Sequence, residues 1–202
     1  MSQTGIQPNS NLCAVQRELL WSSERCQDIV DRVCAERPTP ARVTTSAPMP
    51  GFPGGYSHHG TNPRERRCVE YEVTSQLQTE LFPGMLERLA QLNASLYHFS
   101  LEGFHRSDLP RILEYSSNDE GHFAAHMDVG GAMSTRKLSF VVMLSKPDEY
   151  RGGELEMLPG NVVQVDQGMM IVFPSFLLHQ VHPVTQGTRR VLVGWIHGSP
   201  FS

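Results

Sequence analysis

Two side chains with metal-binding groups lie two positions apart in the segment AAHMDVG. His126 offers an imidazole nitrogen and Asp128 a carboxylate. On an extended segment alternate side chains point to the same face, so both groups could reach one ion from a single strand. His-x-Asp is common by chance, and the pair therefore indicates a metal site only if the chain supplies a third ligand.

The segment FLLHQVHPV supplies two candidates for that ligand, His179 and His182. Two histidines and one carboxylate can occupy one face of iron(II) and leave three positions open for a co-substrate and dioxygen. Residues three apart on a regular strand point to opposite faces, so only one of these histidines can serve, and the other is structural.

Arg189 is the residue that could hold a co-substrate beside this metal. It follows the turn signal Gln186-Gly187 and is expected on the next strand. A buried guanidinium pairs with a carboxylate through two parallel hydrogen bonds, which suits a dicarboxylate. The alternative is a surface arginine that is solvated or salt-bridged, and this is our interpretation of Arg190.

Longer motifs surround these residues from Tyr115 to the C-terminus. They are EGHFAAHMD, RKLSFVVMLSKPDEYRGGELEM and FPSFLLHQVHPVTQGTRRVLVGWIHG. In residue type and order they resemble motifs of the prolyl-4-hydroxylase-like group of iron(II)/2-oxoglutarate oxygenases: Gly-x-aromatic-x-x-His-x-Asp, Tyr-x-Gly-Gly-Glu-Leu, and Leu-His-x-Val-x-Pro-Val followed by Gly-x-Arg. The resemblance implies a double-stranded β-helix core of the jelly-roll or cupin-like type.

Carried over residue by residue, the resemblance implies that His126, Asp128 and His179 are the iron ligands. It favours His179 over His182 because the family's histidine directly precedes the Val-x-Pro-Val stretch. It implies that Arg189 binds the distal carboxylate of 2-oxoglutarate.

The same resemblance bears on three further positions, 115, 191 and 195. Tyr115 matches a tyrosine that contacts the co-substrate in this group, and a core strand tyrosine is an equal alternative. Trp195 matches a family tryptophan, and packing is its simplest role. Val191 stands where many relatives carry serine, which leaves one hydrogen bond to the co-substrate without an obvious donor.

The implied reaction uses iron(II), 2-oxoglutarate and dioxygen, with ascorbate as a stimulant, and releases succinate and carbon dioxide. The resemblance implies that an aspartate at position 128 favours hydroxylation of an unactivated C–H bond over halogenation, and it leaves desaturation or ring formation open. We expect the substrate to be a small metabolite or an amino acid, free or carrier-bound. A prolyl residue in a peptide or protein is the alternative. Two other classes remain open: a non-catalytic jelly-roll binding protein, and a hydrolase or isomerase that uses zinc or manganese.

The elements that must position these residues divide the chain into a helical part and a β-rich part. Apolar spacing predicts helices over 21–37, capped by Ser22 or Ser23, and over 76–96, broken or kinked at Pro83. The Pro- and Gly-rich segment 38–63 is expected to be a flexible loop. Short β-like runs with turn signals between them follow, over 111–115, 137–144, 154–158, 162–165, 169–173, 179–184 and 189–196.

We therefore expect a mainly β fold with flanking helices (α+β). One oxygenase domain would span residues 1–202, with helical support over 12–100 packed on one face of a β-helix core over 109–198.

Composition excludes several functional classes. The chain has 202 residues, 39% hydrophobic and 19% charged, with a formal net charge of −4, which predicts neither a nucleic-acid partner nor an anionic membrane. No secretory signal and no apolar run long enough to span a bilayer is visible. The four cysteines form no CxxC pair, so a reduced, cytoplasmic setting is expected. The sequence predicts no oligomeric state.

Overall fold

Two antiparallel β-sheets face each other in the computed structural model, which describes residues 13–49, 52–157 and 160–201. The larger sheet contains, in spatial order, β1 (Gln16–Leu19), β13 (Met169–Pro174), β9 (Arg136–Met143), β15 (Val184–His197), β7 (Arg111–Ser116), β6 (Val69–Glu72) and β2 (Thr39–Pro40), with β10 (Tyr150–Gly152) paired to β15. The smaller sheet contains β12 (Asn161–Val163), β11 (Leu155–Met157), β14 (His179–Val181), β8 (His122–His126) and β5 (Arg66–Arg67).

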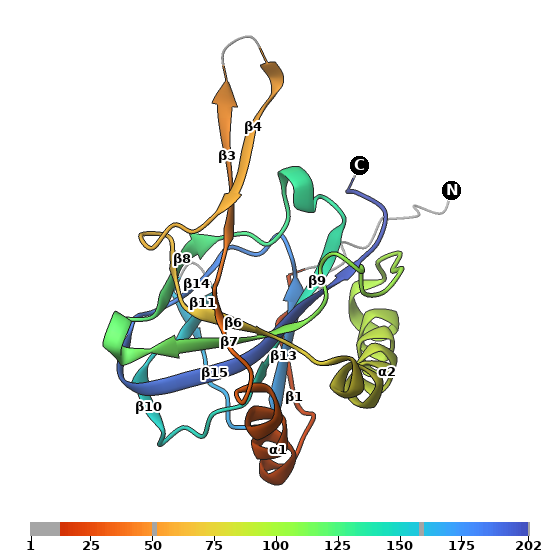
Figure 1. The fold of residues 1–202 in the computed structure, drawn as a ribbon. Coiled ribbons are helices and arrows are strands. Elements are labelled where there is room, and N and C mark those ends of the chain that lie inside the picture. Colours follow the sequence, from red (N-terminus) through yellow and green to blue (C-terminus); the bar gives the residue numbers. More distant parts are fainter. Residues whose placement is uncertain (1–12, 50–51, 158–159, 202) are drawn as a thin grey trace.

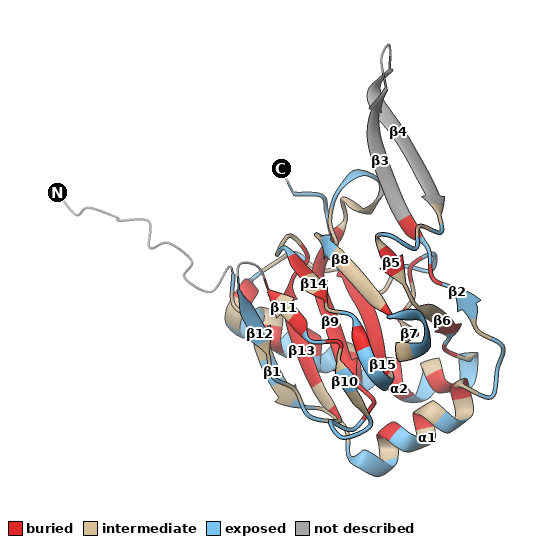
Figure 2. Cartoon of the chain, turned by 90° about the vertical axis from the view of Figure 1, so that its left-hand side faces the viewer, coloured by how far each residue is buried: buried red, intermediate tan, exposed pale blue. Residues whose placement is uncertain are grey.

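Alternation along the strands separates two apolar cores on the two faces of the larger sheet. On β9, Leu138, Phe140 and Val142 face the helices, whereas Val141 and Met143 face the smaller sheet. Buried residues accordingly concentrate along the central strands (Figure 2). One apolar core lies between the two sheets, and the other lies between the larger sheet and the helices that cover its outer face. This is the jelly-roll arrangement expected from the sequence, and that prediction is confirmed.

Two helices cover the outer face of the larger sheet (Figure 1). Helix α1 (Ser23–Val33) begins where predicted, since the Ser22 side chain accepts a hydrogen bond from the Arg25 backbone N–H. Helix α2 (Ser75–Leu92) continues into a π-turn, η1 (Asn93–Tyr97). Of the two effects predicted at Pro83, a break is wrong and a kink stays a prediction. Helix α2 runs through Pro83, because Leu81, Phe82 and neighbouring apolar side chains are buried against the sheet.

Segment 38–63 was expected to be a loop without regular structure, and this is also wrong. It contains β2 and a two-stranded antiparallel sheet, β3 (Val43–Met49) and β4 (Phe52–Gly60), whose pairing runs from Val43↔Gly60 to Met49↔Phe52. Pairing gives the backbone groups of this long segment their hydrogen-bond partners. The hairpin stands out from the two sheets on the side where β8 ends (Figure 1).

The link between β14 and β15 differs from the predicted turn at Gln186-Gly187. Strand β15 begins at Val184 and continues without interruption to His197. From His179 to Gly187 the chain pairs in one antiparallel sense with residues 150–157, so no hairpin turn lies at Gln186-Gly187. Gly187 has a positive φ of 68° within the strand. A β-carbon there would lie 2.0 Å from the Glu149 carbonyl oxygen, so the glycine permits a close backbone approach to β10 rather than a hairpin turn.

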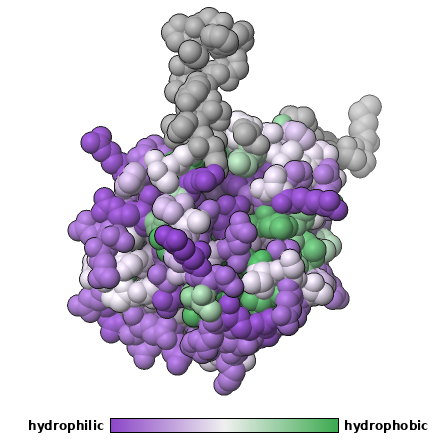
Figure 3. All heavy atoms as spheres, viewed as in Figure 1, coloured by the Kyte–Doolittle hydropathy of each residue, from purple (hydrophilic) through white to green (hydrophobic). Residues whose placement is uncertain are grey.

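The face of the molecule seen in Figure 3 is mostly hydrophilic, with apolar areas set among polar side chains. No helix among the described residues is long and apolar enough to cross a membrane.

Candidate metal and co-substrate site

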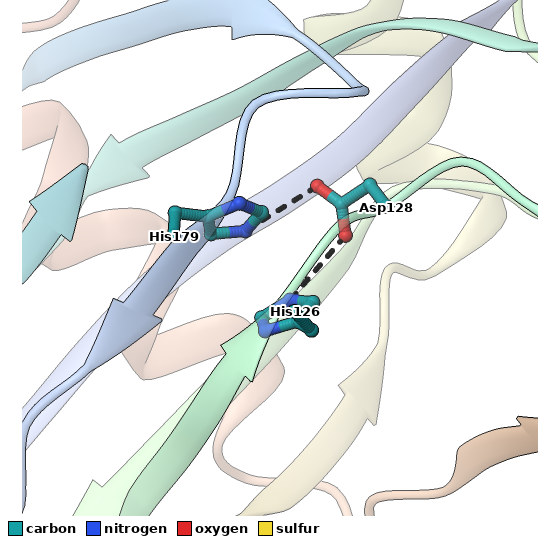
Figure 4. Close-up of side chains that lie close together, drawn as sticks. All are labelled: His126, Asp128 and His179. Carbon is teal, nitrogen blue, oxygen red and sulfur yellow. Dashed lines mark ion pairs between the residues drawn. The ribbon is translucent and has the colours of Figure 1, made fainter. Parts of the chain in front are cut away.

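Three side chains converge at one end of the smaller sheet (Figure 4). His126 is the last residue of β8, His179 is the first residue of β14, and the two are direct partners in the antiparallel register. Asp128 lies two residues beyond β8. Asp128 Oδ1 lies 3.5 Å from His126 Nε2, and Asp128 Oδ2 lies 3.5 Å from His179 Nε2. One potential ligand atom from each residue falls within 4.8 Å of the others.

The two histidines are oriented by the same local device. His126 Nδ1 lies 2.8 Å from the Ala124 carbonyl oxygen, and His179 Nδ1 lies 2.8 Å from the Leu177 carbonyl oxygen. A carbonyl accepts only, so each Nδ1 carries the proton and each Nε2 presents a lone pair toward the other ligands. This is the tautomer that a metal-binding imidazole needs.

Electrostatics favour the metal-binding protonation states of His179 and Asp128. Burial lowers the pKa of His179, which favours its neutral form. Burial alone would raise the pKa of Asp128, but His179, His126 and Arg136 together hold it far below the ordinary value, which favours the carboxylate. Two imidazoles and one carboxylate are a donor set that suits a divalent transition-metal ion.

Arg189 lies in the wall of the same cavity and is 1% exposed. Its Nε and Nη1 atoms are buried and have no hydrogen-bond partner among the described residues. Gly153 makes room for it, since a β-carbon at that glycine would lie 2.8 Å from Arg189 Cδ. Unsatisfied buried donors are costly, so a guanidinium in this state fits a carboxylate ligand that approaches through the cavity.

Tyr115 lies beside that arginine. It pairs with Arg189 in the register of β7 and β15, and the Arg189 guanidinium carbon lies 5.3 Å from its ring centre. The tyrosine is buried in the cavity wall, and burial raises the pKa of its hydroxyl. The neutral hydroxyl can donate a hydrogen bond to a carboxylate held by Arg189.

His182 and Arg190 do not join the site. His182 Nε2 lies 2.5 Å from Glu156 Oε2 on the outer side of the smaller sheet. Arg190 Nε donates to Glu114 Oε2 at 2.7 Å. His182 and Arg190 are thus paired with carboxylates outside the site, as expected for a structural histidine and a salt-bridged surface arginine.

Val191 and Trp195 both line the cavity. The Trp195 ring packs against Arg136, whose guanidinium carbon lies 3.4 Å from the ring centre. Val191 contributes an apolar surface and no hydrogen-bond donor, as its residue type predicted.

Arg66, Phe123 and Ser139 lie near the site but were not identified as site residues from the sequence. Arg66 is 8% exposed, and its guanidinium carbon lies 4.7 Å from the centre of the Phe123 ring. Phe123 in turn stacks on His126, with ring centres 3.5 Å apart. No local pattern could have identified Arg66, because β5 has two residues and is too short to show a period of alternating burial.

The remaining cavity wall is largely apolar. With the residues named above, it is formed by Leu113, Phe140, Val141, Leu155, Phe173, Val181 and Val193.

Comparison with known proteins agrees with this geometry. The model of the 2OG-Fe(II) oxygenase superfamily matches residues 110–197, which include all three converging side chains and Arg189. This stretch of the chain is therefore identified as a 2OG-Fe(II) oxygenase region. The chain is 43% identical over 146 residues to a PKHD-type hydroxylase of Hyphomonas neptunium, an alignment that covers 67% of this chain and 62% of the relative.

A second PKHD-type hydroxylase, from Rippkaea orientalis, is 44% identical over 81 residues, which is 37% of this chain and 36% of the relative. The aligned part of this chain therefore spans less than two thirds of the length of either relative.

Solved structures show the same fold at low sequence identity. A prolyl-4-hydroxylase of Pseudomonas putida superposes with a TM-score of 0.67 at 17% identity, over 93% of this chain and 94% of that one. A Trichoplax adhaerens prolyl hydroxylase in complex with a hypoxia inducible factor peptide fragment gives 0.65 at 15% identity, over 94% and 84%. The chain thus has the prolyl-4-hydroxylase-like form of the fold that the sequence motifs predicted.

Proposed function

We propose that this protein is an iron(II)- and 2-oxoglutarate-dependent hydroxylase. The observation that carries the proposal is that one cavity contains both a two-histidine, one-carboxylate cluster and a buried guanidinium. Two nitrogen atoms of that guanidinium have no hydrogen-bond partner among the described residues. The cluster fits a metal ion with open positions, and the guanidinium fits the far carboxylate of a chelating diacid.

Each residue has a separate task in this proposal. His126, Asp128 and His179 would hold iron(II), and Arg189 and Tyr115 would hold the distal carboxylate of 2-oxoglutarate. When bound, iron, 2-oxoglutarate and dioxygen supply the oxidising chemistry, which forms succinate and carbon dioxide and places one oxygen atom on a substrate carbon. The chain itself orients the bound groups and keeps water out through apolar side chains such as Leu155 and Phe173.

Two substrate classes are supported by different observations. The narrow, largely apolar cavity favours a small metabolite or an amino acid, free or carrier-bound. The fold similarity to prolyl hydroxylases, and the hairpin β3–β4 beside the end of β8, favour a prolyl residue in a peptide. We propose hydroxylation of an amino-acid carbon, with the two classes as distinct outcomes of one assay.

We also propose that one oxygenase domain includes the helices, because α1 and α2 share an apolar core with the larger sheet. All four cysteines are free, which supports a reducing, cytoplasmic setting.

The test is succinate release from 2-oxoglutarate with iron(II) and ascorbate, followed by a screen of amino acids and proline-containing peptides for a mass gain of one oxygen. We expect slow succinate formation without substrate and faster formation with the correct one. Asp128→Ala should abolish both. A wild-type protein that binds metal yet forms no succinate under any condition would instead indicate a non-catalytic binding protein.

A further inference from the structure

Asp128 is held differently from the other two ligands of the proposed site. Each histidine lies at the end of a strand and is fixed by a carbonyl two residues earlier in its own segment. Asp128 lies beyond β8, in a stretch that leads to the 3-10 turn η3 (Gly131–Met133). A side chain outside a strand needs contacts from other elements if its carboxylate is to keep one orientation.

Those contacts come from β9 and from the end of β13. The Ser139 hydroxyl donates to Asp128 Oδ2 at 2.6 Å. Ser139 Oγ also lies 3.0 Å from Ser175 Oγ. The single hydroxyl hydrogen of Ser139 is already donated in the hydrogen bond to Asp128, so Ser175 is the donor in this second contact. The Ser175 backbone carbonyl further accepts the N–H of Asp128 at 2.9 Å.

Ser139 is an unusual residue for its position. It lies in the middle of β9, whose eight residues are all buried, between Leu138 and Phe140. A hydroxyl buried on a central strand destabilises the fold unless it is hydrogen-bonded. Its side-chain hydrogen bonds among the described residues are those to Asp128 and Ser175, so the polar group at this position is directed at the ligand.

We propose that Ser139, backed by Ser175, is a positioning residue that fixes the Asp128 carboxylate for metal binding. The inference rests on the proposed function, because it takes Asp128 as a metal ligand. A short hydrogen bond to an ionised oxygen is strong, and it limits rotation of the carboxylate about its last bond. Ser139 touches no substrate and no reacting atom in this role.

Metal affinity without turnover tests the proposal. Metal is removed from wild-type protein and variants with a chelator. Binding of Mn²⁺ is then measured as the loss of the electron paramagnetic resonance signal of the free ion. Loss of a residue that orients a ligand typically weakens metal binding by about 10–100-fold. We expect a loss of this size for Ser139→Ala and a smaller one for Ser175→Ala, which acts through Ser139. Ser139→Thr keeps the hydroxyl and should stay within a few-fold of wild type.

Ser145→Ala is the matched control. Ser145 is 2% exposed, as Ser139 is, but its hydroxyl donates to the Thr188 carbonyl oxygen and not to the cluster. Its replacement removes a buried serine hydroxyl at similar burial and should leave Mn²⁺ affinity within about two-fold of wild type. If Ser139 had a merely structural role, Ser139→Ala and Ser145→Ala would both have a lower melting temperature, and both would bind Mn²⁺ as tightly as wild type.

Two outcomes would overturn the inference, and they are distinguishable. If Asp128→Ala loses Mn²⁺ binding while Ser139→Ala binds as tightly as wild type, the positioning role is wrong and the proposed function stands. If Asp128→Ala binds Mn²⁺ as tightly as wild type, the ligand assignment fails, and the role of Ser139 fails with it. If Ser139→Ala does not fold, the Mn²⁺ affinity of Ser175→Ala is compared with that of wild type instead, and an unchanged affinity would likewise contradict the positioning role.

Discussion

Adjacent arginines on β15 show how one backbone position changes the role of a side chain. Arg189 faces the cavity and is 1% exposed, whereas Arg190 faces outward and pairs with Glu114 at 2.7 Å. The outward arginine has its counter-ion within the chain. The inward one has two N–H groups without a partner among the described residues, so its counter-ion is expected to be a ligand.

Replacing Arg189 with lysine should weaken 2-oxoglutarate use while leaving the fold intact. Lysine keeps the charge but loses the planar fork that holds both carboxylate oxygens. A hydrogen bond to a charged group contributes about 1.5–3 kcal/mol, so the KM for 2-oxoglutarate should rise roughly 10–100-fold. Steady-state succinate assays measure this, with Arg190→Lys as the control. An equal KM for both variants would contradict the assignment.

At the scale of elements, the sequence predicted the parts that follow a regular period. The start of α1 at its Ser22 cap and the strands that became β7, β9 and β13 follow from local spacing. Strand alternation does not explain how His126 and Asp128 come together, because β8 ends at His126 and Asp128 lies in the loop beyond it. The convergence with His179 came from the resemblance, because spacing alone did not separate it from His182.

The elements that were missed depend on contacts made between distant segments. Arg66 is buried because β5 pairs with β8. The nearest partners in this pairing, Arg67 and His122, are 55 residues apart in the sequence, so no local pattern reveals it. Ser139 is a site residue only because the loop after β8 returns to β9. Helix α2 survives Pro83 because its apolar face is buried, a tertiary effect that outweighs the loss of one helical hydrogen bond.

Pro83→Ala should therefore stabilise the protein. Pro83 is exposed within α2 and cannot donate to the carbonyl four residues earlier, so alanine restores one helical hydrogen bond. We expect the free energy of unfolding to rise by about 1–3 kcal/mol, measured by urea denaturation. Gly84→Ala is a useful control, since no atom lies within 4 Å of a β-carbon there and the gain should be about 0.5–1 kcal/mol from helix propensity alone. A lower stability for the alanine variant at position 83 would show that the proline has a packing role.

For the whole molecule, a buried ionic cluster joins the chain before β7 to the C-terminal end of β15. Asp108 accepts from Arg136 Nε at 2.7 Å and Nη2 at 2.9 Å, and His197 Nε2 lies 3.2 Å from the same carboxylate. Arg136 also donates to the Asp128 backbone carbonyl at 3.3 Å. The cluster thus links the packing of the larger sheet to the loop that carries a proposed metal ligand.

The metal-free protein should lose stability as the pH falls below neutral. Burial lowers the pKa of His197, so between its folded value and the ordinary value of 6.5 the unfolded chain binds a proton that the folded chain does not. This contribution is fully present above about pH 6.5 and is lost as the pH falls through the folded pKa. His197→Gln should reduce the decline in unfolding free energy between pH 7.5 and 5.5. It should not remove the decline, because burial lowers the pKa of His179 as well. An unchanged slope in the variant would refute this explanation.

Ligand binding should stabilise the whole fold in a defined order. The two histidines come from neighbouring strands of the smaller sheet, Asp128 from the loop after β8 and Arg189 from the larger sheet, so only the folded chain presents the site. Mn²⁺ at 100 times its Kd should add about 2.7 kcal/mol, which is roughly 5–10 °C in Tm for a chain of this size. 2-Oxoglutarate should raise the Tm further in wild type but not in Arg189→Ala. A rise with 2-oxoglutarate in that variant would place the co-substrate elsewhere.

The most direct measurement is anaerobic equilibrium dialysis of the chain with iron(II) and labelled 2-oxoglutarate. The assignment predicts one iron and one 2-oxoglutarate per chain, with tight 2-oxoglutarate binding only when iron is present. Asp128→Ala should bind neither tightly, and Arg189→Ala should keep its iron and lose the 2-oxoglutarate. Stoichiometric iron binding by Asp128→Ala, or 2-oxoglutarate binding by Arg189→Ala at wild-type affinity, would contradict the central claim.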